Sequence, residues 1–503
     1  MKPFSLGRDC LTWSTLVSLA AKPNPSLEVS SETWVRVDAF RKIVESAISS
    51  GKVIYGINTG FGFLADVRIE TDKLQALQYN LIRSHACGVG EMVSPEMTRA
   101  LLILRAHTFL LGHSAVTRHT VETVLTFLRH DILPAIPCQG SVGASGDLAP
   151  LSHLALGLIG EGDVLYQGVK IPAKEALKKA DIRPLVPSAK EGLSLINGTQ
   201  FMSVLGAFAV RDAKNLSESA DVIAALSLEA IKGTKAAFDP RIHSVRDQPG
   251  QKKVSSHMLA LLSGPDDIMD SHANCERVQD PYSFRCIPQV HGATRDVIDF
   301  VAARVDGDLN SVTDNPLVFE DGAVISGGNF HGQPLAMALD FLAIAVAELG
   351  SISERRIEKL TNPAMSGLPA FVVKESGLNS GFMIPHVVAA SLVSENKILC
   401  HPASVDSIPT SADKEDHVSM GPIAGRKALR ICAHVADILA IEALTAAQGI
   451  DLHAPLKPSL PLQKVHDKIR ILSPTMPVDR SLHPDILSVS QWVKSGGALE
   501  ALN

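Results

Sequence analysis

The chain has 503 residues, of which 46% are hydrophobic, 20% charged and 5% aromatic, and its formal net charge is −6. A disordered chain would carry fewer apolar residues and more charge per residue, so this composition predicts a folded protein of two to four domains, or one large helical domain with an appendage. The small negative charge gives no general attraction to nucleic acid or to anionic lipid surfaces.

The first candidate element is the apolar stretch 11–21, which follows Arg8 and Asp9. A signal peptide needs a basic flank and an uninterrupted apolar core, whereas this stretch follows an acidic residue and contains four hydroxyl residues. It therefore predicts an ordinary first helix. The seven cysteines are scattered and form no CxxC pair, which argues against a disulfide framework or a zinc ribbon. We expect a soluble cytoplasmic protein without a membrane-spanning segment.

The first 195 residues mix short helices with turn signals. Residues 51–64 contain four glycines and predict a loop, because glycine costs about 1 kcal/mol in a helix interior. Apolar residues spaced by three and four predict helix over 96–130. The stretch 134–143 is too rich in proline and glycine for a regular helix, and 163–172 predicts a hairpin around Gln167-Gly168. This part is expected to form a mixed N-terminal domain, 1–195.

From residue 196 onward, long helical periods dominate. They cover 199–232, 291–311, 331–360, 386–400 and 420–448, and are separated by irregular stretches such as 361–385 and 401–417. Helices of 20 to 30 residues lying side by side would form a bundle of roughly 30–45 Å. The predicted fold class is therefore mainly α, with a mixed N-terminal domain followed by a long central helical bundle and C-terminal helices, 196–503.

Several common catalytic signatures are absent from the sequence. It contains no HExxH, GxSxG, Walker A or strand-flanked GxGxxG motif, so zincin, serine-hydrolase and nucleotide chemistry have no support. His107, His113 and His119 recur every six residues, which does not align them on one helical face. We expect core or surface roles for these histidines and no metal site.

The most unusual stretch is Gly140–Pro150. One interpretation is a glycine-rich turn in which Ser145 or Asp147 caps the following helix or the loop binds an anion. The other concerns Ala144-Ser145-Gly146. Attack of the Gly146 nitrogen on the Ala144 carbonyl, followed by loss of two waters including the Ser145 hydroxyl, would leave an electrophilic methylidene imidazolone. Glycine leaves the nitrogen unhindered, and serine supplies the leaving oxygen. Among several chains of this size, about one is expected to contain this tripeptide by chance. The surrounding sequence therefore has to decide between the two interpretations.

That context consists of eight motifs in order. The sequence resembles the aromatic amino acid ammonia-lyases through Tyr55–Gly62, Asn80–His85, Gly140–Pro150, Asn197–Thr199, Gln279–Arg285, Thr313–Pro316, Gly328–Gly332 and Glu415–Gly421. This family builds 4-methylideneimidazole-5-one (MIO) autocatalytically from Ala-Ser-Gly. The resemblance implies a fumarase/aspartase-like helical fold and a homotetramer whose active sites combine loops from several subunits. It also implies MIO from Ala144-Ser145-Gly146 as the only cofactor.

The resemblance also implies residue roles. Tyr55 and Tyr282 become the candidate general bases, with Tyr282 slightly favoured, and a nearby cation such as Arg285 would favour the phenolate. Arg285 would clamp the substrate carboxylate, unless it forms a structural salt bridge. Asn197 would bind the carboxylate or the MIO carbonyl, or cap the helix after it. The remaining candidates are Gln279 and Asn329 lining the site, Phe330 packing on the MIO ring or in the core, and His85 and Glu415 binding the imidazole or the amine.

Ser84-His85 and Glu415-Asp416-His417 are similar to the histidine-specific members of the family. They imply non-oxidative deamination of L-histidine to trans-urocanate and ammonia, the first step of histidine degradation. A phenyl substrate would leave His85 and Glu415 unpaired, at about 1–3 kcal/mol each. The sequence departs from many relatives at Gln333, where we expect glutamate. Alternatives are a tyrosine or phenylalanine ammonia-lyase or aminomutase, an inactive helical scaffold, and an anion-binding protein that leaves the loop unmodified.

Overall fold

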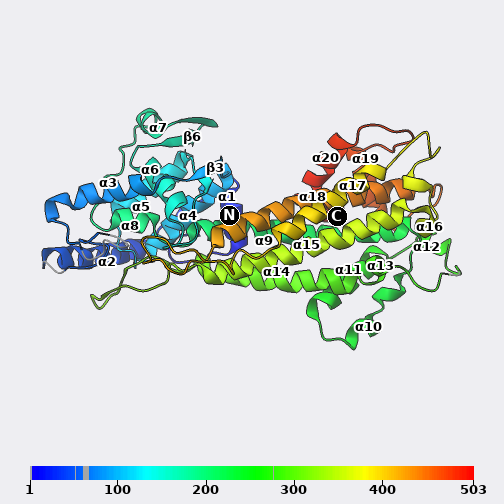
Figure 1. The fold of residues 1–503 in the computed structure, drawn as a ribbon, viewed down its shortest axis with the longest axis horizontal. Coiled ribbons are helices and arrows are strands. Elements are labelled where there is room, and N and C mark those ends of the chain that lie inside the picture. Colours follow the sequence, from blue (N-terminus) through cyan, green and yellow to red (C-terminus); the bar gives the residue numbers. More distant parts are fainter. Residues whose placement is uncertain (1–2, 51–52, 61–66, 276, 503) are drawn as a thin grey trace. The chain divides into compact units, whose positions relative to one another are not determined.

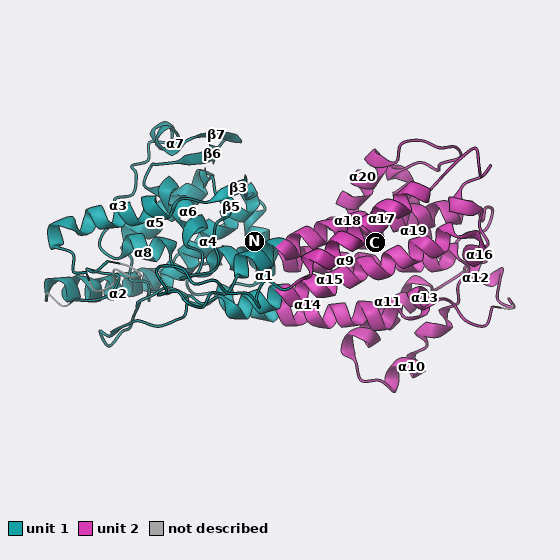
Figure 2. Ribbon diagram, in the orientation of Figure 1, with its two compact units in different colours: residues 1–208, 302–339, 402–426 teal, residues 209–301, 340–401, 427–503 magenta. Residues whose placement is uncertain are grey.

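The computed structural model describes residues 3–50, 53–60, 67–275 and 277–502. The chain is 59% helical and forms two compact units, coloured separately in Figure 2. Unit 1 comprises residues 1–208, 302–339 and 402–426, and unit 2 comprises 209–301, 340–401 and 427–503. Each unit is built from three stretches of chain, so both contain segments that are far apart in sequence.

Unit 1 contains helices α1 to α8 and, within the described residues, all nine strands β1 to β9 (Figure 1). Helices α3, α6 and α8 pack against one another, and α4 is buried along nearly its whole length. The helices are α1 (Trp13–Ala20), α2 (Ser31–Ser49), α3 (Leu74–His85), α4 (Pro95–Leu110), α5 (Arg118–Arg129), α6 (Leu148–Leu158), α7 (Ala173–Lys179) and α8 (Glu191–Ile196). The predicted first helix is confirmed as α1, whose N-cap Thr12 accepts a hydrogen bond from the Thr15 amide.

The strands of unit 1 form small sheets. They are β1 (Phe4–Ser5), β2 (Leu27–Glu28), β3 (Val89–Met92), β4 (Leu133–Pro134), β5 (Pro137–Gln139), β6 (Asp163–Tyr166), β7 (Val169–Pro172), β8 (Leu317–Val318) and β9 (Val324–Ile325). The predicted hairpin is confirmed, because β6 and β7 pair antiparallel across Gln167-Gly168, both with positive φ. The predicted continuous helix over 96–130 is wrong. It is interrupted between α4 and α5, where Gly112 and Ala115 have φ values of 97° and 52° that end a right-handed helix.

Four long helices contribute residues to both units: α9 (Gln200–Ala230), α14 (Ile287–Leu309), α15 (Gln333–Thr361) and α18 (Gly421–Asp451). Together with α17 (Met383–Leu399), they confirm the five long helical periods predicted from residue 196 onward. Within unit 2 these helices lie side by side (Figure 1). Polar contacts also join them, since Ser227 on α9 donates to Glu442 on α18, and Arg356 on α15 pairs with that same carboxylate.

The rest of unit 2 is made of short helices and loops: α10 (Pro240–Ser244), α11 (Pro249–Leu261), α12 (Asp267–Asp270), α13 (Tyr282–Arg285), α16 (Pro363–Ser366), α19 (Leu460–Leu472), α20 (His483–Lys494) and α21 (Gly497–Glu500). Single 3₁₀ turns lie at Thr71–Lys73, Lys235–Phe238 and Ala370–Val372. The stretches 361–385 and 401–417, predicted as irregular, contain only short helical turns among the described residues.

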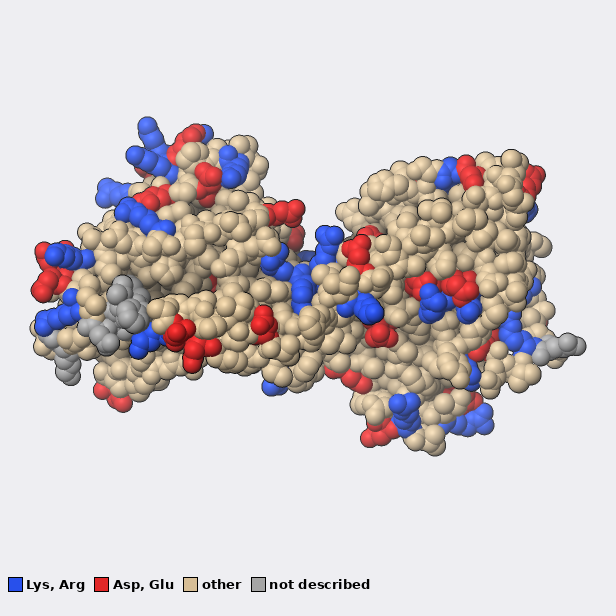
Figure 3. Space-filling view, viewed as in Figure 1, with Lys and Arg blue, Asp and Glu red and all other residues tan. Residues whose placement is uncertain are grey.

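Helix α15 is apolar enough to span a membrane, a feature that the sequence analysis overlooked. An 18-residue window in it has a mean hydropathy of 1.9, but 67% of that window is buried inside the protein, so α15 is a core helix. On the face drawn in Figure 3, basic and acidic side chains are interspersed in small groups. All seven cysteines are free thiols, as expected.

Candidate active site

A cavity of about 410 Å³ in unit 1 brings four distant segments of the chain together. Of the residues proposed from sequence, five line it: Tyr55, Ala144, Ser145, Phe330 and Glu415. The other lining residues are Gly143, Asn315, Ser326, Gly327, Gly328, His331, Lys414, Asp416 and His417. The Ala-Ser-Gly loop, the Tyr55 loop and two later motifs therefore meet at one site.

The loop that carries Ser145 follows a strained path. Ser145 has a φ of 50°, and Gly143 and Gly146 have φ values of 80° and 76°, all in the left-handed region. Non-glycine residues seldom adopt this region, and such outliers concentrate at functional sites. The Met420 amide donates to the Val142 carbonyl, which ties the loop to the start of α18. The sharp bend at Ser145 is thus held by its surroundings.

Gly198 lies directly behind the Ser145 bend. Its amide donates to the Ser145 carbonyl at 3.3 Å, and its own carbonyl accepts from the Asp147 amide at 2.8 Å. A Cβ atom on Gly146 would lie 2.1 Å from the Gly198 oxygen, well inside contact distance. Glycine at 146 is therefore required by this close approach of two backbones as well as by the positive φ.

The side chain of Asp147 caps a helix, but not the helix that follows it in sequence, which was the one expected. Its Oδ2 accepts from the Met202 amide at 2.9 Å in the first turn of α9, whereas α6, which follows Asp147 in sequence, receives no side-chain cap. The proposed capping of α6 by Ser145 or Asp147 is therefore wrong. Asp147 is fully buried, and burial raises the pKa of its carboxyl to about 8.

Asn197 does not cap α9. It is 3% exposed, and its side-chain Oδ1 finds no hydrogen-bond partner in the described part of the chain. Buried amide oxygens are rarely left without a donor, so this atom is available to a group formed or bound beside it. Its backbone carbonyl is held by the buried Arg105 at 3.1 Å.

Glu415 faces Ser145 across the cavity. The Ser145 hydroxyl lies 3.5 Å from Glu415 Oε1, while Thr410 donates to Oε2 at 2.7 Å and orients the carboxylate. Beside it, the rings of His331 and His417 stack at a centroid distance of 5.5 Å with an interplanar angle of 16°. The wall thus offers a carboxylate acceptor and two imidazoles next to the serine.

The sequence analysis assigned no role to Asn315, His331, Lys414, Asp416 or His417, although all five line the cavity. Each of them except Lys414 lies inside a motif that was quoted for the family resemblance. Membership of those motifs was the signal that could have identified them. Lys414 lies one residue before its motif, and only the folded loop reveals its place.

Four predicted residues of unit 1 do not line the cavity, and one of them is Gly146, which is packed against Gly198. Nδ1 of His85 lies 2.9 Å from the Leu81 carbonyl on its own helix, α3. The Asn329 amide nitrogen donates to the Val312 carbonyl at 3.4 Å, and Asn197 lies behind the Ser145 loop next to Gly198.

Gln279, Tyr282 and Arg285 belong to unit 2. Tyr282 is 71% exposed, and the Arg285 guanidinium stacks over its ring at 4.5 Å. The Nε atom of Arg285 is buried without a hydrogen bond among the described residues. The cation thus lies beside Tyr282, and its role toward the phenol stays a prediction.

The loop fits a ring built from Ala144, Ser145 and Gly146. Its left-handed bend, the absence of room for a side chain at 146 and the Gly198 amide that donates to the Ser145 carbonyl all suit a compact heterocycle that keeps this carbonyl as a polar substituent. Among the described residues, no group of three or more His, Cys, Asp or Glu side chains could hold a metal ion. His107 and His113 instead bond to the backbone at Gly7 and Val318.

Residues 11–471 match the family model described as aromatic amino acid lyase. The chain is 51% identical over 507 residues to a histidine ammonia-lyase from Sorangium cellulosum, covering 99% of this chain and 98% of that protein. The crystal structure of histidine ammonia-lyase from Trypanosoma cruzi superposes with a TM-score of 0.92 at 46% identity, over 100% of this chain and 95% of that one. Tyrosine aminomutase from Streptomyces globisporus superposes with a TM-score of 0.93 at 36% identity, over 99% and 98% of the two chains.

Proposed function

Because the chain belongs to the aromatic amino acid lyase family, we propose that it is a histidine ammonia-lyase, a carbon–nitrogen lyase that converts L-histidine to trans-urocanate and ammonia. The observation that carries this proposal is the high identity to histidine ammonia-lyases over nearly the full length of both chains. The cavity beside Ser145, with Glu415 and two imidazoles in its wall, supplies a polar site for an imidazole substrate. The reaction is the first step of histidine degradation.

The proposal includes MIO formed from Ala144-Ser145-Gly146, as the family uses this group. The Gly146 nitrogen would attack the Ala144 carbonyl, and two waters would leave, one carrying the Ser145 hydroxyl oxygen. When formed, the group supplies an electrophile that makes the amino group of the substrate a better leaving group. The Gly198 amide would donate to the ring carbonyl, which is that of Ser145, and Asn197 would contribute through its side-chain N–H, while Phe330 borders the ring in the cavity. No external cofactor is needed.

The chain's own residues would bind the substrate and move its proton. Glu415, oriented by the hydrogen bond from Thr410, accepts a hydrogen bond from the imidazole or the amine of the substrate. His85 is assigned to the same task because it belongs to the Asn80–His85 motif. Arg285 would hold the carboxylate. One of the two tyrosines, Tyr55 or Tyr282, takes the β-proton, because that C–H is weakly acidic and needs a positioned base. Gln279 and Asn329 complete the proposed site.

Asn315 adds a donor to this set. Its side-chain Oδ1 accepts from the Gly327 backbone amide at 2.8 Å and from the Ser326 hydroxyl at 3.1 Å, so the side-chain nitrogen Nδ2 is the atom left to donate. That nitrogen makes no hydrogen bond within the described residues, and Asn315 lines the cavity.

We also propose a homotetramer whose active sites combine loops from several subunits. Apolar side chains remain exposed along α14 and α15, including Phe300, Phe341 and Ile344, and they border a groove of about 420 Å³ lined by Val290, Ala293 and Val297. Single exposed apolar residues are ordinary, but a continuous apolar groove on long helices is typical of an interface between subunits. The strong exposure of Tyr282 agrees with a site that another copy completes.

Two further expectations remain part of the proposal. The seven free thiols suit a reducing compartment, so we place the enzyme in the cytoplasm, with no nucleic-acid or membrane partner. The division into an N-terminal domain, 1–195, that carries the loop and a helical domain, 196–503, stays a prediction.

The proposal is tested with purified full-length protein and three substrates in parallel. We expect urocanate absorbance to develop with L-histidine and no cinnamate or coumarate absorbance with L-phenylalanine or L-tyrosine. Chromatography of the same reactions detects β-amino acids, which an aminomutase would produce. Intact mass should be lower than the sequence mass by two waters. A Ser145→Ala variant should fold as the same oligomer with almost no turnover. Normal turnover by that variant would refute the mechanism.

A further inference from the structure

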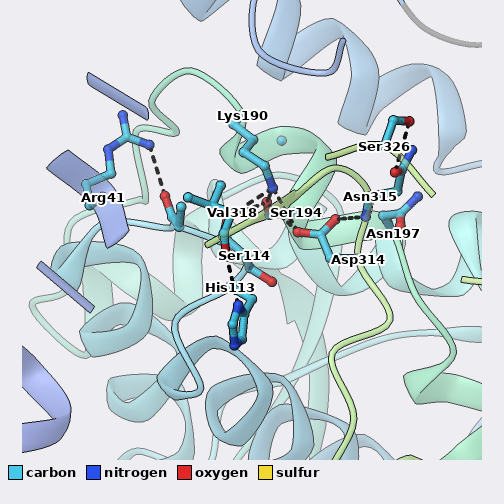
Figure 4. A network of polar contacts seen from close by, with 12 residues as sticks. Arg41, His113, Ser114, Lys190, Ser194, Asn197, Asp314, Asn315, Val318 and Ser326 are labelled. Atoms are coloured by element: carbon cyan, nitrogen blue, oxygen red, sulfur yellow. Dashed lines mark hydrogen bonds and ion pairs between the residues drawn. The ribbon is translucent and has the colours of Figure 1, made fainter. Parts of the chain in front are cut away.

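A lysine buried inside unit 1 joins three segments near the cavity. Lys190 has no exposed surface, and its ammonium donates to Asp314 Oδ2 at 2.9 Å, to the Ser194 hydroxyl at 2.8 Å and to the Ser114 carbonyl at 3.0 Å. An ammonium has three N–H donors, so all three are used. Figure 4 shows Lys190 above Asp314, with Ser194 between them and Asn315 on the far side of the carboxylate.

From Asp314 the contacts lead to the cavity wall. Asp314 Oδ1 accepts from the backbone N–H of Asn315 at 2.7 Å, which leaves Oδ2 to Lys190 and Ser194. The Asn315 side chain then accepts from Ser326 and Gly327. Asn315, Ser326 and Gly327 all line the cavity, whereas Lys190 and Asp314 do not. The buried pair therefore anchors the backbone of a residue that lines the site, without touching the site itself.

A second route leads from the same lysine to the Ser145 loop. Ser194 accepts from Lys190, donates to Asp314 and belongs to α8, which is followed directly by Asn197. The next residue, Gly198, bonds to the backbone at Ser145 and Asp147. Thr313, beside Asp314, accepts from the Thr199 amide at 3.1 Å, so the two routes are also joined to each other.

Stability alone does not account for this pair. Taking two charges out of water costs several kcal/mol per ion, and a well-packed apolar pair of similar volume is often as stable or more stable. What an apolar pair cannot do is fix the hydrogen-bond direction of Asp314, Asn315 and Ser194 at the same time. We propose that Lys190 is a positioning residue, which orients Asn315 and supports the Ser145 bend through Asp314 and Ser194. This inference rests on the proposed function of the cavity.

The test compares two double variants that both remove the two charges. Lys190→Met with Asp314→Asn keeps a hydrogen-bond acceptor at 314, whereas Lys190→Met with Asp314→Leu removes it. We expect kcat/KM for histidine to fall about 100-fold in the Leu double, since a misplacement of about 1 Å can cost this much, and less in the Asn double. A matched control is Arg99→Met with Asp131→Asn, a pair in unit 1 at 2.9 Å that does not contact the cavity. It should lose stability but keep kcat and KM.

Intact mass is measured before kinetics. A double variant that retains both waters while the control has lost them supports the route through Ser194 and Gly198. A variant that has lost both waters, with kcat/KM reduced, supports the route through Asn315. The inference is overturned if the Leu double has lost both waters and its kcat and KM stay within twofold of the unmodified chain.

Should both doubles fail to fold, Ser194→Ala is the decisive variant, because it leaves the ion pair intact. It should lower kcat/KM about tenfold, and an unchanged kcat and KM would overturn the inference. Failure of the proposed function has a different signature, namely no histidine turnover by the unmodified chain. In that case amide hydrogen exchange of residues 313–328 is the readout. Faster exchange in the Asn double or in Ser194→Ala supports the positioning role, and unchanged exchange refutes it.

Discussion

Asp147 Oδ2 accepts a hydrogen bond from the Met202 amide at 2.9 Å, so a residue of the Ser145 loop caps the long helix α9 instead of the helix that follows it in sequence. The contact couples the loop to the helix bundle at a fully buried point. It also places a carboxyl whose pKa burial raises to about 8 directly after the Ala-Ser-Gly tripeptide.

The raised pKa of Asp147 predicts a pH dependence of stability. In the unfolded chain this carboxyl loses its proton near pH 3.8, whereas in the folded protein it keeps the proton to about pH 8. Between these values the folded state binds more protons, so its stability falls as pH rises through this window. We expect Asp147→Asn to flatten the fall in Tm between pH 5 and 8, measured by thermal unfolding. A parallel, equally steep curve for the variant would contradict the assignment.

The crowding at Gly146 predicts that alanine cannot replace it. A Cβ there would lie 2.1 Å from the Gly198 carbonyl oxygen, so the two backbones must separate. We expect Gly146→Ala to keep the mass of the unmodified sequence, to show almost no turnover and to unfold at a lower temperature. Gly168→Ala is the matched control, because Gly168 has a φ of 77° but nothing within 4 Å. It bears only the left-handed cost of roughly 1–2 kcal/mol. Equal effects of the two changes would disprove the crowding argument.

The hydrogen bond from Thr410 predicts a specific role for the charge of Glu415. Glu415→Gln can still accept from Thr410 but loses the negative charge that faces the cavity. We expect kcat/KM for histidine to drop about 100-fold with little change in Tm, because a hydrogen bond to a charged group contributes more than one to a neutral amide. Asp413→Asn, two residues earlier and not part of the cavity lining, should change neither quantity. Retained activity in Glu415→Gln would remove this residue from the substrate site.

Phenylalanine variants distinguish which of the two candidate bases, Tyr55 or Tyr282, removes the β-proton. Replacing the true base should lower kcat by about 10²- to 10⁴-fold, with KM nearly unchanged, and should abolish the acidic limb of the pH–rate profile, because the base acts only when deprotonated. We expect this result for Tyr282→Phe and a smaller loss for Tyr55→Phe. Tyr166→Phe, in strand β6 and outside the cavity lining, serves as the control. The reverse order of effects would assign the base to Tyr55.

Local sequence patterns were enough to predict the long helices of the fold. The periods at 199–232 and 420–448 became α9 and α18 within a few residues of their expected ends, because helical spacing of apolar residues is a property of adjacent turns. The pattern failed at 96–130, where the almost fully buried α4 and the amphipathic α5 were predicted as a single helical stretch. The break at Gly112 and Ala115 depends on how α4 and α5 pack against each other, which no short window reports.

For the site, the amino-acid sequence by itself determined which chemical groups are available and that an Ala-Ser-Gly tripeptide occupies 144–146, because these depend on covalent structure and on the order of motifs. Only the tertiary structure decided which groups meet. Asn315 and His417 join Ser145 at one cavity, and Lys190 reaches Asp314 from 124 residues away. Such contacts arise from the packing of whole helices and loops, and their directions follow from hydrogen bonds between segments that share no local pattern.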